Sequence, residues 1–218
     1  MKKILFLTVG LFPLLFSSQN NIQTSNPPVV FEALVGNKGL ASQMTINKNF
    51  EGSKKLGFFS VANISSKWSE DHSKDAMIQA NITFEVIKNL RLVGGSHYTP
   101  NTGLRPTAGF IYSKNFNDFL LVVNPRFIGF SKSSIAEGFI MMEYKPKISE
   151  NWKGYSRIQG LYSETIKDGE HARSYLMLRL GLSHRFITFG VGANFDSYGP
   201  FKDSKQNYGV FAAARLFN

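Results

Sequence analysis

The stretch that decides the fold is LMLRLGLSHR, residues Leu176–Arg185. In an extended chain the leucines at positions 176, 178, 180 and 182 share one face, whereas Arg179, Ser183 and Arg185 share the other. Strict alternation of this kind is the signature of a β-strand with one apolar and one polar face. Residues 76–87, 186–195 and 208–216 repeat the pattern, so the chain is predicted to be all-β.

The same alternation, followed along the chain, predicts about twelve strands in one domain. They lie near residues 29–36, 40–48, 55–65, 75–87, 89–97, 103–113, 118–128, 134–145, 152–163, 171–184, 186–195 and 207–217. Strands then take up more than half of the chain after residue 28, which is high for a globular domain but natural for a closed barrel. We therefore predict a closed antiparallel up-and-down β-barrel over residues 29–218.

The first residues read as an export signal. In MKKILFLTVGLFPLLFSSQ two lysines precede an apolar run from Ile4 to Phe16, and small or polar residues follow. A positive start, a short apolar centre and a small-residue end define a secretory signal peptide, and the run is too short to span a bilayer as a helix. Residues 1–19 are predicted to be this peptide, which is cleaved, and residues 20–28 a short periplasmic segment.

Composition excludes several classes of function. The 218 residues carry a formal net charge of +10 and no cysteine, which excludes a disulfide scaffold, a Cys-ligated metal and a cysteine nucleophile. The lysines are dispersed over many loops and the arginines follow the strand period, so we expect lipopolysaccharide phosphates rather than nucleic acid as the partner. Scattered histidines and the lack of a phosphate-binding glycine loop predict no metal and no cofactor.

Three features favour a membrane barrel over a soluble one. Several predicted strands run to about ten residues, as a tilted membrane-spanning strand requires. Arginines fall on the polar phase of strands, whereas lysines gather in the connections; a rigid guanidinium suits a confined polar interior. Short and long connections alternate, as expected for a barrel with short turns on the periplasmic side and long loops outside. The short ones lie near Lys88, residues 114–117 and residues 184–185, and the long ones near residues 66–74, 164–170 and 197–206.

An exported, cysteine-free, alternating chain that ends in an amphipathic strand resembles the bacterial outer-membrane β-barrel class, and most of all the small barrels of Bacteroidota-type bacteria. The resemblance covers residues 29–217 and implies an outer-membrane location and contact with the barrel-insertion machinery. Members of that class end in an aromatic residue on the apolar phase. Here Phe217 is offset by one position from the apolar series of Tyr208 to Leu216, and Asn218 follows it.

The candidate site is the lumen. The residues predicted to line it, as an anion path or a salt-bridge network, are Arg91, Arg105, Arg126, Arg157, Arg173, Arg179, Arg185, Arg215, Glu85 and Glu143. Glu32 and Glu137 share the arginine phase. The excess of arginine predicts either a narrow passive pore that prefers small anions or a closed structural barrel in which Arg–Glu pairs fill the interior.

Two alternatives stay open. The first is a secreted or periplasmic soluble β-barrel or sandwich that binds a small ligand in an apolar interior. The second is a lipid hydrolase, because GSHYTPNTG (Gly95–Gly103) resembles the motif of outer-membrane phospholipase A and the lipid A deacylases. That resemblance implies His97 as base, Thr99 as nucleophile and Asn101 as the residue that orients the histidine. Because His97 shares the phase of Arg91, it is expected to face the lumen, and no catalytic residue is predicted.

Overall fold

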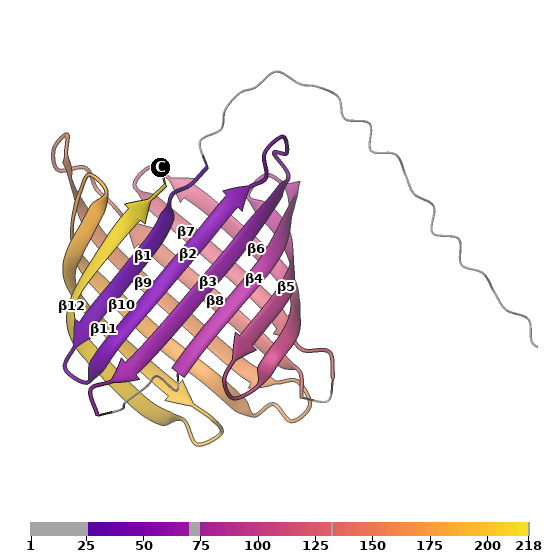
Figure 1. Cartoon of the computed structure of the whole chain (residues 1–218). Coiled ribbons are helices and arrows are strands. Elements are labelled where there is room, and N and C mark those ends of the chain that lie inside the picture. The colour runs from indigo at the N-terminus through magenta and orange to yellow at the C-terminus, as the bar shows by residue number, and fades with distance from the viewer. Residues whose placement is uncertain (1–25, 70–74, 132, 218) are drawn as a thin grey trace, which may run out of the picture.

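Twelve antiparallel strands form one closed barrel in the computed structural model, which describes residues 26–69, 75–131 and 133–217 (Figure 1). They are β1 (Val29–Gly36), β2 (Gly39–Asn49), β3 (Leu56–Lys67), β4 (Asp75–Ile87), β5 (Leu90–Thr99), β6 (Gly103–Phe116), β7 (Phe119–Ile128), β8 (Ile135–Tyr144), β9 (Trp152–Thr165), β10 (His171–His184), β11 (Ile187–Tyr198) and β12 (Asp203–Leu216). Each strand pairs with its neighbours in sequence, and β1 closes the barrel against β12 from Val29–Leu216 to Gly36–Gly209. Closure removes the free edges of the sheet, and the predicted fold class is confirmed.

The chain before β1 is described from Asn26 onward. The predicted signal peptide, residues 1–19, and most of the 20–28 segment lie outside the described residues. The side chain of Asn26 is hydrogen-bonded to the end of β2. Its Nδ2 donates to the carbonyl of Asn49 at 3.1 Å, and its Oδ1 accepts from the N–H of Asn49 at 2.7 Å. Over the described ranges no helix has the length and apolar character needed to cross a membrane.

The connections divide into two sets, one at each end of the barrel. The terminal rim holds Asn26, Phe217 and the connections that leave β2, β4, β6, β8 and β10; the loop rim holds the others (Figure 1). The predicted short turns at the terminal rim occur at residues 88–89, 117–118 and 185–186, but residues 50–55 and 145–151 are longer. The first is a turn with Gly52 at φ 75°, in which Ser53 Oγ accepts from the backbone N–H of Leu56. In the second, Pro146 has no N–H to extend β8.

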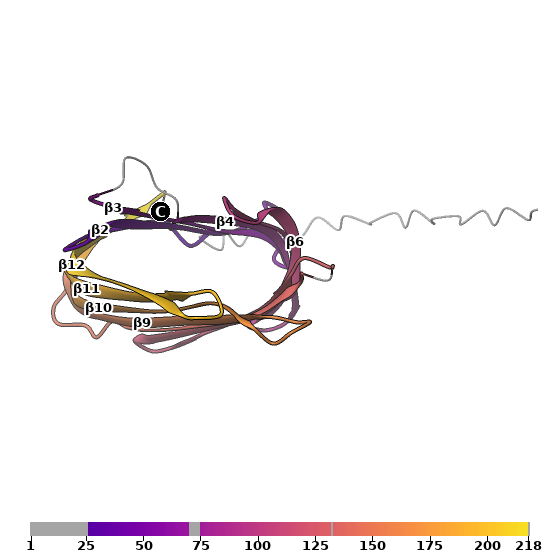
Figure 2. The ribbon, with the colours of Figure 1, turned by 90° about the horizontal axis from the view of Figure 1, so that it is seen from below.

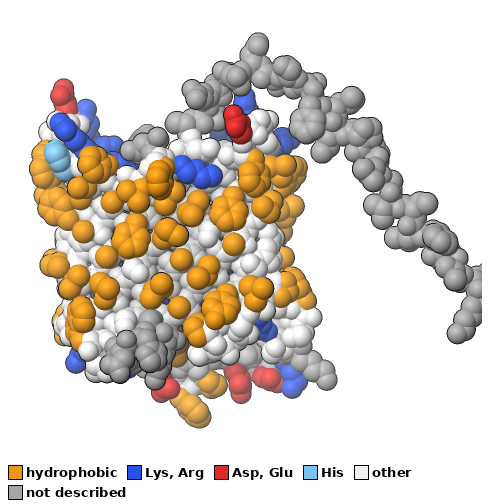
Figure 3. Space-filling view, viewed as in Figure 1, with side chains coloured by type: hydrophobic (Ala, Val, Ile, Leu, Met, Phe, Trp, Pro, Cys, Tyr) orange, Lys and Arg blue, Asp and Glu red, His pale blue; other side chains and the backbone are white. Residues whose placement is uncertain are grey.

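The outer face of the barrel is apolar. Side chains at even positions of β10 point outward, and Leu180 is 64% exposed; Val191 on β11 and Val210 on β12 are 57% and 61% exposed. Figure 3 shows this apolar band between two rims where the charged side chains gather. Many inward side chains are polar and buried, for example Gln79, Asn81 and Thr83 on β4. A soluble barrel with an apolar core would have the opposite arrangement.

The barrel is flattened rather than round. Seen along its axis it has an oval outline, with β2, β3 and β4 in one broad wall and β9, β10, β11 and β12 in the other (Figure 2). Flattening brings inward side chains of strands that do not pair with each other within reach. Contacts between the walls therefore decide whether the interior is open.

Candidate functional site

The interior is held by ion pairs. Five of the eight arginines predicted for the lumen are paired with carboxylates inside the barrel: Arg91, Arg126, Arg157, Arg173 and Arg179. Three of these five are at least 90% buried as whole residues: Arg126, Arg157 and Arg179. A buried charge is tolerated only when it is paired and hydrogen-bonded, so each of these guanidiniums needs acceptors inside the barrel.

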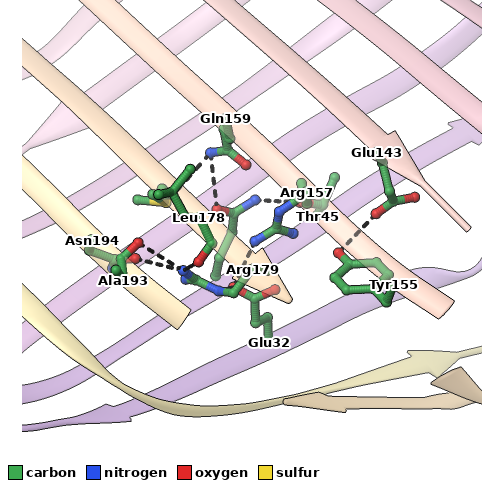
Figure 4. Close-up of polar contacts among 12 residues, drawn as sticks. Glu32, Thr45, Glu143, Tyr155, Arg157, Gln159, Leu178, Arg179, Ala193 and Asn194 are labelled. Atoms are coloured by element: carbon green, nitrogen blue, oxygen red, sulfur yellow. Dashed lines mark hydrogen bonds and ion pairs between the residues drawn. The ribbon is translucent and has the colours of Figure 1, made fainter. Parts of the chain in front are cut away.

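The central cluster joins strands that are not neighbours. The Oε1 atom of Glu32 on β1 accepts a hydrogen bond of 2.8 Å from Nη2 of Arg157 on β9 and another of 2.8 Å from Nε of Arg179 on β10 (Figure 4). The side chains are only 2–6% exposed. Because β11 and β12 separate β10 from β1 in the barrel order, this shared carboxylate ties two parts of the wall together across the interior.

Arg179 is fixed by further acceptors on its own side of the barrel. Its Nη1 donates to the carbonyl of Leu178 at 2.9 Å, to that of Ala193 at 3.3 Å and to Oδ1 of Asn194 at 2.9 Å. Gly192 makes room for this side chain, since a Cβ there would lie 2.8 Å from Arg179 Cδ. A guanidinium presents several donors in a rigid fork, and here they hold it across the lumen.

A second polar contact spans the interior next to this cluster. Gln159 on β9 donates from Nε2 to the hydroxyl of Tyr175 on β10 at 3.0 Å and lies 3.4 Å from Oε1 of Gln43 on β2. Gln159 is 2% exposed. The amide therefore extends the central cluster toward the opposite wall.

Apolar packing closes the space beside the charges. Leu34, Tyr155 and Phe211 form a buried cluster to which Ala41 adds, and Leu34 has no exposed surface at all. The hydroxyl of Tyr155 donates to Oε2 of Glu143 at 2.9 Å (Figure 4). The apolar cluster thus brings side chains of β1, β2, β9 and β12 together inside the barrel.

A separate cluster lies toward the loop rim. Arg173 on β10 donates from Nη2 to Oδ1 of Asp196 on β11 at 3.0 Å, and its Nη1 lies 3.8 Å from Oδ1 of Asp75 on β4. The hydroxyl of Tyr198 donates to Asp75 and so links the same two walls. Neither aspartate was among the residues predicted to line the lumen, although Asp75 shares the phase of inward Gln79 and Asp196 that of inward Asn194.

Two other pairs stay within one wall. Arg126 on β7 binds Glu137 on the adjacent strand β8, with 2.6 Å between Nε and Oε1. Arg91 and Glu85 face each other at the β4–β5 turn, 3.3 Å apart, and Arg91 also donates to Oδ1 of Asn49 at 2.8 Å. These pairs neutralise charge along the wall without bridging the lumen.

Three arginines predicted to line the lumen lie at the rims instead. Arg105 binds the carbonyl and the hydroxyl of Ser133 in the loop after β7. Arg185 occupies the β10–β11 turn with φ 53°, and Arg215 near the chain end donates to its carbonyl; both are exposed. Arg105 and Arg215 keep the inward phase, because Arg105 pairs with inward His97 and Arg215 follows inward Phe211 by four positions, but both lie near strand ends. Arg185 lies outside the strands, where the alternation of faces ends.

The candidate hydrolase motif is not assembled. His97 is buried inside the barrel, and its Nδ1 lies 3.5 Å from Nη2 of Arg126. Thr99 instead exchanges a hydrogen bond with Thr102 in the β5–β6 turn, with 2.8 Å between the two hydroxyl oxygens. His97 faces the interior, as its phase with Arg91 predicted, and it has no access to lipid from there.

A cavity of about 30 Å³ lies among Glu32, Gln43, Asn63, Arg173 and Arg179, which is room for one or two water molecules. At the central cluster two guanidiniums face one carboxylate, so the local formal charge is +1. At the loop-rim cluster one guanidinium faces two carboxylates, and the ammonium of Lys205 lies 4.4 Å from the centre of the Tyr198 ring.

Together, the closed barrel, its apolar outer band and its ion-paired interior define a β-barrel with the faces of a membrane-spanning one, apolar outside and polar inside. The chain resembles a solved NanC porin with a TM-score of 0.53 and 13% sequence identity, over 87% of this chain and 100% of the porin. A KdgM porin matches 87% of this chain and 99% of its own with a TM-score of 0.48 and 9% identity. No family model and no curated protein matches the sequence.

Proposed function

We propose that this protein is an integral outer-membrane barrel whose lumen is closed at rest by the central cluster of Glu32, Arg157 and Arg179. The observation that carries the proposal is the single carboxylate oxygen that holds both guanidiniums across the interior. The apolar outer band supports insertion in a bilayer, and the terminal rim would face the periplasm, because outer-membrane barrels keep their chain ends and short turns there.

Two partners follow from this location. Lipopolysaccharide phosphates would bind lysines of the loop rim, among them Lys38, Lys167, Lys202 and Lys205. The barrel-insertion machinery would deliver the chain to the membrane. Resistance to carbonate extraction and a heat-modifiable shift on a gel test both the location and the closed barrel.

The finer function is a narrow passage for small anions. The central cluster carries one positive charge in excess, and Arg157 Nε is buried without a hydrogen-bond partner among the described residues. A small anion could therefore exchange with the carboxylate of Glu32 when the cluster opens, whereas a cation would meet two guanidiniums. If the cluster never opens, the protein is the closed structural barrel.

Single-channel recording in planar bilayers separates these possibilities. The wild type is expected to show no steps or rare small ones, and Glu32→Gln to show frequent anion-selective steps, because the amide cannot hold both guanidiniums. Glu85→Gln is the matched control: its pair with Arg91 joins adjacent strands and should leave the barrel closed. Large wild-type steps, cation selectivity, or equally frequent openings in the two variants would contradict the proposal. Silence of both variants assigns the closed structural barrel.

A further inference from the structure

A serine and a histidine outside the lumen are joined in a chain of hydrogen bonds that the proposed function does not use. Nε2 of His171 lies 2.9 Å from Oγ of Ser174, and Nδ1 of His171 lies 2.6 Å from the carbonyl oxygen of Gly199. His171 is 6% exposed, and Ser174 is half-buried. A hydroxyl, an imidazole and an acceptor that orients the imidazole are the parts of an activated nucleophile.

The contacts determine which ring nitrogen carries the proton. A backbone carbonyl only accepts hydrogen bonds, so the short contact with Gly199 requires Nδ1 to carry hydrogen. In the neutral ring Nε2 is then the acceptor and receives the O–H of Ser174. This is the tautomer in which a histidine removes a proton from a serine hydroxyl.

A bulge in β10 places both side chains on the outer wall. Residues three apart on a regular strand point to opposite faces. Here the register against β9 shifts between His171 and Arg173, and the extra residue turns His171 to the face of Ser174. That face is the outer one: Ser174 pairs directly with outward Tyr162, which is 49% exposed and whose ring centroid lies 5.6 Å from that of His171.

An apolar hollow in the outer wall ends at the same tyrosine. Its volume is about 930 Å³, and outward Phe84, Phe110, Phe127 and Tyr162 line it. Gly138, which pairs with Tyr162, forms part of its floor, and a Cβ at Gly138 would meet no atom within 4 Å. The hollow is large and apolar enough for acyl chains, and it faces the region where such chains lie in a membrane.

His171 and Ser174 lie near the loop rim, at the level where the ester groups of membrane lipids would lie. Ser174 is the fourth residue of β10, which begins at the loop rim, and a loop with Lys167, Asp168 and Glu170 precedes it. The aromatic side chain of Tyr162 beside it is of the type that gathers at the membrane–water interface. Lipid esters lie between the acyl chains and the polar head groups, so an ester bound over Tyr162 would reach Ser174.

From these observations we infer that Ser174 and His171 form a lipid acyl-ester hydrolase site on the outer wall, with the hollow as the acyl-chain seat. Oγ of Ser174 attacks the ester carbonyl carbon while its proton passes to Nε2 of His171. The C–O bond to the alcohol then breaks, and His171 returns the proton to the leaving oxygen. Water, activated by the same histidine, hydrolyses the acyl-serine, and the products are a fatty acid and an alcohol.

The test uses the folded full-length protein, with folding checked by the heat-modifiable gel shift. Release of fatty acid is measured by mass spectrometry from vesicles of phosphatidylethanolamine and, separately, of lipid A, so that the two arms distinguish the sources of the ester. We expect release from at least one of them and a loss of at least about 100-fold in Ser174→Ala. Labelling with a short-chain fluorophosphonate should add its mass to the peptide that contains Ser174.

Matched variants separate catalysis from structure. Ser156→Ala removes another outward serine on β9 and should leave release unchanged. Gly138→Trp fills the hollow, so it should reduce release from lipid while the short-chain probe still labels Ser174. Folded wild type that releases no fatty acid from either lipid and takes no label overturns the inference, as does Ser174→Ala that retains release. The hydrolase site does not include Glu32. The result of this test is therefore independent of the conductance measurements.

Discussion

Glu32→Ala should destabilise the barrel far more than the removal of an ordinary surface carboxylate. The side chain of Glu32 is 4% exposed, and those of its partners Arg157 and Arg179 are 6% and 2% exposed. The variant therefore leaves two guanidiniums inside the barrel without their shared counter-charge. Breaking a buried pair by removing one partner costs about 3–5 kcal/mol. Because this one substitution breaks two ion pairs, we expect the loss of unfolding free energy to lie at the upper end of that range.

The assay is urea unfolding in lipid vesicles, followed by tryptophan fluorescence and by the gel shift. Glu85→Ala is the control, because its pair with Arg91 is 32% and 19% exposed at the side chains; an exposed pair contributes about 0–1 kcal/mol. Adding Arg157→Leu to Glu32→Leu should recover part of the loss, since apolar replacement of a buried pair is often neutral. A Glu32→Ala loss no larger than that of Glu85→Ala would refute the buried cluster.

Three other substitutions probe the two faces of the wall and its packing. Leu180→Arg places a charge in the apolar band and should cost about 2–4 kcal/mol in the same unfolding assay; no loss would mean that this position faces water. Gly192→Val should cost about 1–3 kcal/mol because its side chain would collide with Arg179, whereas Gly94→Val, with nothing within 4 Å of an added Cβ, should be close to neutral. Phe211→Ala empties part of the apolar cluster and should cost about 3–5 kcal/mol; a neutral result would argue against packing inside the barrel.

The strands could be predicted from the sequence because the apolar and polar faces alternate with almost no interruption. The 171–184 strand was placed with its observed ends, and the 207–217 strand began four residues late against β12 (Asp203–Leu216). The missed residues explain why: Asp203, Ser204, Lys205 and Gln206 are all polar, so they show no alternation. Outside the apolar band a strand can be polar on both faces. The alternation therefore stops before the strand does, and a prediction from alternation makes the strand too short.

The contacts of the candidate site could be predicted only in part. Glu32 and Arg157 were assigned to the inward phase, but their meeting across the interior depends on the flattening of the barrel, which a period of two does not encode. Asp75 lies at the first position of the predicted 75–87 strand and of β4, where the alternation is the weakest guide to the face, and it was not assigned to the lumen. The contact between His171 and Ser174 was not predicted, because a bulge changes the face on which His171 lies and the sequence gives no sign of that bulge.

The central claim is that the aliphatic rows face hydrocarbon and the charged rows face an enclosed interior. The chain has no cysteine, so spin labels on single-cysteine variants at positions 176–183, in reconstituted vesicles, test it without background. Relaxation by dissolved oxygen, which concentrates in hydrocarbon, should peak at the even positions, with Leu178 and Leu180 highest, and fall at the odd ones. Peaks at the odd positions, or strong relaxation of Leu180 by a water-soluble nickel complex, would contradict the account.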